Sequence, residues 1–233
     1  PVFDIDSIGL LGLLGKMNGG LDVAQPNAKK PTHLAPTQFY SGAVVTNFKL
    51  HENEVMPQLL KMEKKLEAGA KFLINQIGYD SRKIHELHAW MQQRGHGDVP
   101  LIGNVYVLSP GVAKVFNAQK IPGVVVSEEL AAICEEQRAS ADKGKQFFLE
   151  LAAKQVAIYR GLGYRGAYLG GVHTVAEIER VLEIEKSYGP DDWKQFAREI
   201  RYSRPGEFFI FHEDPETGLA NPDKLHPDYE GSL

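Results

Sequence analysis

Apolar side chains recur every three or four residues along positions 54–67, and charged side chains fall between them. The apolar positions are Val55, Leu59, Met62 and Leu66. This spacing is typical of an amphipathic helix that covers a core. After a turn at 68–70, the nearly continuous apolar run 71–77 is typical of a parallel strand buried on both faces. The pattern therefore predicts a helix that packs on a buried strand.

The same two patterns alternate along most of the chain. They predict four further strands, at 39–45, 99–105, 121–126 and 167–173. Helical patterns lie before, between or after them: at 8–17, from 81 to 95, starting at 109 and at 127, and at 145–162 and 174–186. Residues 21–36 are rich in Pro, Asn and Lys, so we expect a long loop there. This alternation favours an α/β fold with a parallel sheet or (β/α)8 barrel, but a closed barrel needs eight strands and three are not accounted for.

The composition of the chain changes after Gly189. One further helix around 193–200 and one aromatic strand at 207–212 precede a polar, Pro-rich tail. We therefore expect two parts, with the α/β unit at 1–189 and a C-terminal extension at 190–233.

Composition narrows the class of protein. The 233 residues are 43% hydrophobic and 24% charged, as in ordinary globular proteins. The net charge of −4 and the lack of a Lys/Arg stripe argue against nucleic-acid binding, and no apolar run reaches the roughly 20 residues of a membrane span. The single Cys134 excludes an internal disulfide framework and fits a cytoplasmic location. The chain begins with Pro1 instead of Met, so we expect that an upstream portion has been removed.

Few local motifs carry chemistry. The sequence has no G-x-S-x-G, H-E-x-x-H, C-x-x-C or Walker motif. His85 and His88 are three apart on a predicted helix, and packed histidines explain them better than a metal does. Gln76 and Gly170 fall at the carboxyl ends of predicted strands, where α/β folds bind ligands, although a plain turn explains Gly170 equally well. Lys65 fits either a solvated helix face or a phosphate contact.

Four segments carry a resemblance to a known family. In chain order they are FYSGAVVTNF, KKLEAGAKFLINQIGYD, VPLIGNVYVLS and IPGVVVSEEL. Together they resemble the later part of the flavin-dependent methylenetetrahydrofolate reductases, over roughly residues 2–186. The resemblance implies a (β/α)8 TIM-type barrel whose N-terminal strands are missing from this chain. It also implies FAD at the strand ends and hydride transfer from NAD(P)H, through the flavin, to 5,10-methylenetetrahydrofolate, giving 5-methyltetrahydrofolate.

The resemblance also implies roles for individual residues. The folate-binding candidates are Gln76, Phe116 and Gly170. The flavin-binding candidates are Thr46, Asn47, His51, Gln58, Lys61, Lys65 and Ile74. This chain departs from the family where Thr46-Asn47 replaces the usual Asn-Pro. The family's general acid is expected upstream of Pro1, so no catalytic residue is assigned here and no metal is expected.

Two other functions remain open. The chain fits a non-catalytic folate- or flavin-binding subunit of a one-carbon complex, and it also fits a corrinoid-linked folate methyltransferase. The methyltransferase would need no flavin, so retention of flavin on purification separates it from the reductase. The expected partners are a folate substrate and either a second copy of the chain or a partner subunit.

Overall fold

A computed structural model describes residues 4–26 and 29–231; Pro1 lies outside these ranges. Its centre is a four-stranded parallel sheet in the order β3-β4-β5-β6. The strands are β3 (Gly42–Val45), β4 (Phe72–Asn75), β5 (Leu101–Tyr106) and β6 (Gly166–Gly170). The order follows the sequence without reversal, as in one part of a singly wound barrel. Within the described residues, the sheet is not closed.

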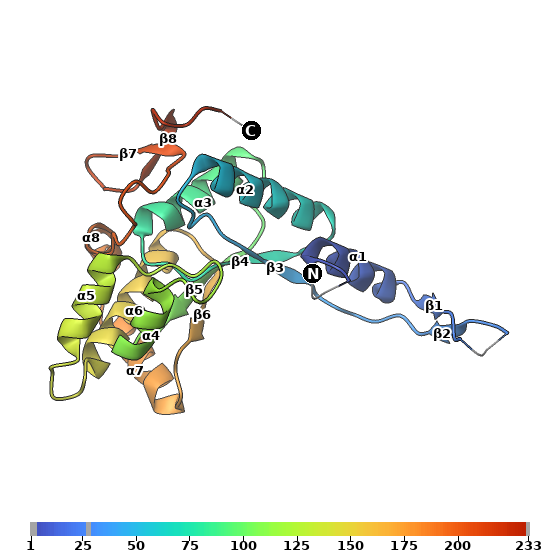
Figure 1. The fold of residues 1–233 in the computed structure, drawn as a ribbon, viewed down its shortest axis with the longest axis horizontal. Coiled ribbons are helices and arrows are strands. Elements are labelled where there is room, and N and C mark those ends of the chain that lie inside the picture. The colour runs from blue at the N-terminus through green and yellow to red at the C-terminus, as the bar shows by residue number, and fades with distance from the viewer. Residues whose placement is uncertain (1–3, 27–28, 232–233) are drawn as a thin grey trace.

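Helices connect successive strands and cover one side of the sheet (Figure 1). They are α2 (Glu52–Glu67) after β3, α3 (Ser81–Gln93) after β4, and α4 (Pro110–Asn117), α5 (Glu128–Gln137) and α6 (Lys145–Gly161) after β5. The last strand leads into α7 (Val175–Lys186). The predicted helices are therefore confirmed, and α2 buries Val55, Leu59 and Met62 completely. Several of these helices have a side-chain N-cap. At these positions the side chain accepts a hydrogen bond from a backbone N–H of the first turn, as it does at Asp80, Ser109, Ser127 and Thr174.

The two faces of the sheet differ in exposure. Toward the helices, Leu73 and Val105 are fully buried. On the opposite face, Val44 is 47% exposed and Tyr168 is 57% exposed. The expectation that 71–77 is buried on both faces is therefore wrong for the described chain, because helices cover only one side. Parallel sheets normally bury both faces, which makes the open face the notable feature of this fold.

Two of the predicted elements before α8 need correction. Residues 121–126 form no strand, so four of the five expected strands enter the sheet. The reason is the turn at Pro122-Gly123, where Gly123 has φ +81°. The expected loop at 21–36 instead contains an antiparallel hairpin of β1 (Leu21–Val23) and β2 (Thr32–Leu34). These three-residue strands are too short to show an alternating pattern.

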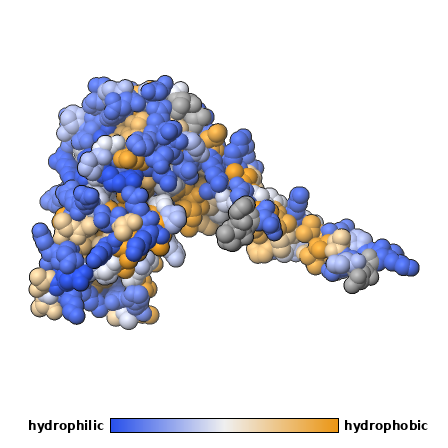
Figure 2. Space-filling model, in the orientation of Figure 1, coloured by the Kyte–Doolittle hydropathy of each residue, from blue (hydrophilic) through white to orange (hydrophobic). Residues whose placement is uncertain are grey.

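The hairpin and α1 (Ser7–Asn18) form an arm that projects from the body (Figure 1). Leu11 is buried in α1, whereas Leu10 is 46% exposed. Figure 2 shows hydrophobic surface where the arm joins the body. None of the helices in the described part of the chain combines the length and the apolar character needed to cross a bilayer.

The C-terminal segment folds onto α3 and α6. It contains α8 (Asp192–Glu199), β7 (Phe211–Glu213) and β8 (Ala220–Leu225), which pairs with β7. The predicted strand at 207–212 is therefore largely wrong, because 208–210 are buried without pairing in a sheet. The tail after 213 contains a strand that the polar sequence did not reveal. The division into 1–189 and 190–233 stays a prediction.

Candidate functional site

The open face of the sheet carries two rows of side chains near the carboxyl ends of the strands. The first row, in register across the four strands, is Val44, Ile74, Ile102 and Gly166. Two residues further along each strand, the same face carries Thr46, Gln76, Asn104 and Tyr168. An apolar row thus lies beneath a polar row. This arrangement places hydrogen-bonding groups at the strand ends, where parallel α/β folds bind ligands.

Gln76 occupies a defined position in the polar row. Its backbone N–H donates to the Val45 carbonyl at 2.8 Å, which extends the β3–β4 ladder by one residue. Its side-chain Oε1 accepts the N–H of Ile77 at 2.9 Å. The Nε2 group lies beside Gly123, 3.4 Å from where a Cβ there would stand. Gln76 therefore offers an amide N–H₂ donor to a ligand at the mouth of the sheet.

The aromatic group at the strand ends is Tyr106. Its ring contacts Phe116 edge-on, with 5.2 Å between centroids, and a Cβ on Gly170 would lie 3.1 Å from it. The predicted folate residues Phe116 and Gly170 are therefore brought together by Tyr106. Phe116 is 7% exposed, so half-buried Tyr106 presents the accessible ring. Sequence reasoning missed Tyr106, although alternation along β5 places it on the same face as Ile102.

The predicted flavin residues after β3 have different surroundings. Thr46 lies in the polar row, where its hydroxyl accepts the Phe48 N–H at 3.2 Å. Asn47 is 1% exposed, and its Nδ2 donates to the Lys83 carbonyl at 2.7 Å. Its Nδ2 group is thus occupied within the protein, and a flavin contact by Asn47 stays a prediction. His51 is exposed at the start of α2, away from this row.

Gln58, Lys61 and Lys65 share one face of α2, beside the free edge of β3. The Lys65 ammonium donates to the Val44 carbonyl at 2.6 Å, and Lys61 lies 3.6 Å from Asp6. Burial lowers the pKa of Lys65, and the charge of Lys61 lowers it further. Two ammonium groups with one nearby carboxylate favour an anionic group beside them. The bond from Lys65 places this basic face beside β3, the edge strand that leads to Thr46.

A cavity of about 320 Å³ opens at the carboxyl ends of β5 and β6. Its apolar lining is Tyr106, Val107, Leu108, Pro110, Val112, Phe148 and Leu149. Its charged or titratable lining is Asp142, Lys143, Lys145, His173 and Glu177. Because Tyr106 also belongs to the aromatic group beside Phe116, this cavity adjoins the candidate site.

Both carboxylates of this cavity are engaged within the protein. The His173 backbone N–H donates to Glu177 at 2.8 Å and Lys145 pairs with Glu177 at 3.0 Å, which together lower the Glu177 pKa to about 2. Hydrogen bonds from the Gln146 N–H and the Ser140 hydroxyl lower the pKa of Asp142. Both groups are therefore ionised near neutral pH, and neither is suited to donate a proton there.

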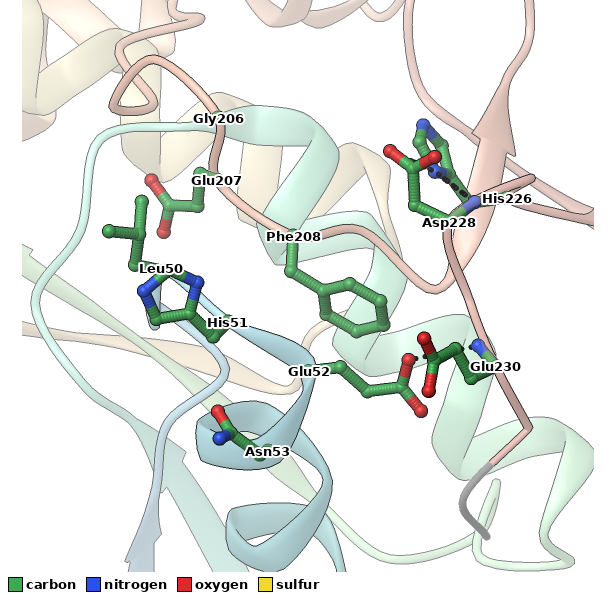
Figure 3. A pocket seen from close by; sticks show the side chains of 10 residues that line it. All are labelled: Leu50, His51, Glu52, Asn53, Gly206, Glu207, Phe208, His226, Asp228 and Glu230. Atoms are coloured by element: carbon green, nitrogen blue, oxygen red, sulfur yellow. Dashed lines mark hydrogen bonds and ion pairs between the residues drawn. The ribbon is translucent and has the colours of Figure 1, made fainter.

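A second cavity, of about 550 Å³, lies where the start of α2 meets the C-terminal segment (Figure 3). In Figure 3 the Phe208 ring lies between the start of α2, at Glu52, and the C-terminal segment, at Asp228 and Glu230. The acidic side chains of the lining are Glu52, Glu207, Asp228 and Glu230, and His51 and His226 also contribute. Glu52, Asp228 and Glu230 would repel an anionic ligand, whereas Glu207 is buried and pairs with Arg204. Although it is larger, this cavity is less suited to an anionic ligand than the strand ends are.

No metal site is apparent within residues 4–26 and 29–231. No group of three or more His, Cys, Asp or Glu side chains there is placed to hold an ion. His85 and His88 are half-buried on α3, and burial lowers the pKa of both side chains. Cys134 is a buried free thiol, as expected.

The comparisons with known proteins give little support for a family. No protein-family model matches the chain. Among solved structures, the chain is similar to a protein from Clostridium thermocellum described as uncharacterized and as binding two copies of 5-methyl-5,6,7,8-tetrahydrofolic acid. The identity is 14% and the TM-score 0.43, over 62% of this chain and 52% of that protein, so the match spans about half of its length. A likeness this low carries no conclusion about this chain.

Proposed function

We propose that this chain binds a reduced folate at the carboxyl ends of its parallel strands, as part of a methylenetetrahydrofolate reductase-type flavoenzyme. The observation that carries the proposal is the row of Thr46, Gln76 and Asn104 above an apolar row on the open face. A pterin is a flat heterocycle whose edge carries hydrogen-bond donors and acceptors. The Gln76 amide and the Tyr106 ring supply the polar and aromatic contacts that such a ring needs.

The residues of this chain fit FAD in part. Lys61 and Lys65 lie together on α2 and could hold the diphosphate, since within residues 4–26 and 29–231 the carboxylate beside them is that of Asp6. Asn47 fits less well, because its Nδ2 group donates to the Lys83 carbonyl in the core. When bound, the flavin supplies the hydride chemistry. The residues of this chain bind and orient: the Gln76 amide faces the pterin edge, and Ile74 with Tyr106 gives an apolar surface beside it.

A second candidate function is a binding subunit without catalysis, and the state of two carboxylates is consistent with it. The carboxylates beside the strand ends, Asp142 and Glu177, are both held ionised by hydrogen bonds. Neither is suited as the general acid of a reductase at neutral pH. This function predicts folate binding by the chain without oxidation of NADH or NADPH.

The experiment measures flavin and folate binding separately. The purified chain is titrated with FAD, followed by flavin fluorescence, and with 5-methyltetrahydrofolate, followed by calorimetry. We expect Gln76→Ala to weaken folate binding about tenfold or more, which is the loss of one well-placed hydrogen bond, and to leave FAD binding unchanged. We expect Lys65→Met to weaken FAD binding.

Each variant has a matched control. Exposed Gln195 bonds to Glu199 on α8, so Gln195→Ala should leave folate binding unchanged. Lys64, adjacent to Lys65, pairs with Glu67 at the surface, so Lys64→Met should leave FAD binding unchanged. The proposal fails if the chain binds neither ligand, or if Gln76→Ala and Gln195→Ala behave alike. If binding occurs, oxidation of NAD(P)H with 5,10-methylenetetrahydrofolate separates the reductase from the binding subunit.

A further inference from the structure

The cavity at the ends of β5 and β6 is not used by the ring contacts described above. It encloses about 320 Å³, within the range of small-molecule sites, and it shares Tyr106 with the proposed folate site. A ligand whose ring rests against Tyr106 can therefore extend into it. Its floor is apolar, from Val112, Phe148 and Leu149.

Among the described residues, some of the charged side chains around the cavity have partners within the protein, and others do not. Lys145 is neutralised by Glu177 at 3.0 Å, and Asp142 accepts N–H bonds from Gly144 and Gln146 at the start of α6. Lys143 differs, because no carboxylate in the described part of the chain lies within ion-pair distance of it. The Lys143 ammonium is therefore the cation on this rim that is left for a ligand.

His173 also lines the cavity, in the loop between β6 and α7. Its backbone N–H donates to Glu177, and its side chain is exposed. An imidazole N–H donates to a carboxylate in either tautomer. Lys143 and His173 thus place two donors around a space with an apolar floor.

We infer that this cavity binds the acidic tail of the ligand, with a ligand carboxylate at Lys143 and His173. This inference rests on the proposed function, which supplies the class of ligand. A folate carries an aromatic amide and a glutamate after its pterin ring. The aromatic part suits the floor of Val112, Phe148 and Leu149, and the glutamate carboxylates suit the rim.

The test compares two ligands that differ in the tail. The first is 5-methyltetrahydrofolate and the second is 6-methyltetrahydropterin, which lacks the benzoylglutamate. We expect Lys143→Met to weaken binding of the folate about five- to tenfold, which is the effect of one charge-assisted hydrogen bond at an exposed rim. We expect the same variant to bind the pterin as the unmodified chain does. The folate loss should shrink at about 0.5 M NaCl, because salt screens an exposed charge.

Two further variants complete the test. Lys120→Met removes an exposed lysine outside the cavity and should leave both affinities unchanged. His173→Ala should act like Lys143→Met. Equal loss for both ligands, or no loss for the folate, overturns the inference. If neither ligand binds the unmodified chain, the proposed function fails first; if both bind and Lys143→Met has no effect, only the tail site fails.

Discussion

The carboxylate of Glu86 on α3 accepts the backbone N–H of Ile210 at 2.6 Å, although 124 residues separate them. The same oxygen accepts the Phe211 N–H at 3.2 Å, and the other oxygen lies 3.3 Å from the buried Lys83 ammonium. Lys83 also donates to the Phe208 carbonyl. This buried ion pair therefore fixes the C-terminal segment to the α/β unit.

We predict that Glu86→Gln destabilises the fold by about 3 kcal/mol, because it leaves the Lys83 charge buried without its counterion. Lys83 and Glu86 are both fully buried, so water cannot compensate. The urea unfolding midpoint, followed by circular dichroism, measures the change. As a control, Glu67→Gln removes an exposed pair with Lys64 and should cause no measurable change. Equal midpoints for the two variants would contradict the prediction.

A second prediction concerns the close contact between β5 and α6. A Cβ on Gly103 would stand 2.3 Å from the Tyr159 ring, whose hydroxyl accepts a hydrogen bond from Asn75 at 2.8 Å. We expect Gly103→Ala to cost about 1–3 kcal/mol through overpacking, measured by thermal or urea unfolding. Gly111→Ala is the control, since nothing lies within 4 Å of a Cβ there and Ala favours the helix α4. Gly103→Ala with unchanged stability would show that α6 can move away from the sheet.

The parts of the fold that sequence predicted have strong local signals. The periodic apolar positions of 54–67 led to α2, and Ser127 and Thr174 are capping residues that mark helix starts. Gln76 could be placed at a strand end because an apolar run stops there. Each of these signals lies within one element or its immediate boundary.

The remaining features depend on contacts that local sequence does not record. Residues 124–126 are apolar enough for a strand, but the preceding Pro-Gly turn directs them away from the sheet. Asn47 resembles a ligand contact at a strand end, whereas the packing of α3 turns its amide into the core. No local motif marks Tyr106 as a ligand contact, and the resemblance implies Phe116 as the aromatic contact instead. Its position depends on which face of β5 the helices cover.

A third prediction concerns the reactivity of Cys134. The thiol on α5 is fully buried, and burial raises its pKa to about 11. Because the thiolate is the reactive form, we expect no labelling by Ellman's reagent at pH 8 in the native chain and complete labelling in denaturant. Val175→Cys adds a thiol at a position that is 70% exposed, and it should label at once. Rapid labelling of native Cys134 would show that α5 opens readily.

A fourth prediction concerns acid stability at the cavity beside β6. The Glu177 pKa is lowered to about 2 by the His173 N–H and Lys145, whereas an unfolded glutamate has a pKa of about 4.3. A carboxyl whose pKa is lower in the folded chain binds fewer protons there than in the unfolded chain. Its stabilising effect is therefore fully present above about pH 4.5 and is lost as the pH falls from there toward about 2.

Glu177→Gln removes this effect. As the pH falls across this range, the stability of the variant should therefore fall less than that of the unmodified chain. The measurement is the urea midpoint at a series of pH values, taken as the difference between variant and unmodified chain because Asp6 and Asp142 also have lowered pKa values. Glu183→Gln, which removes a surface pair with Arg180, serves as the control and should keep the original pH profile. A constant difference between Glu177→Gln and the unmodified chain from pH 6 to about pH 2 would mean that Glu177 titrates alike in the folded and unfolded states. The bonds from His173 and Lys145 would then be absent in solution, and the rim of the cavity would be open.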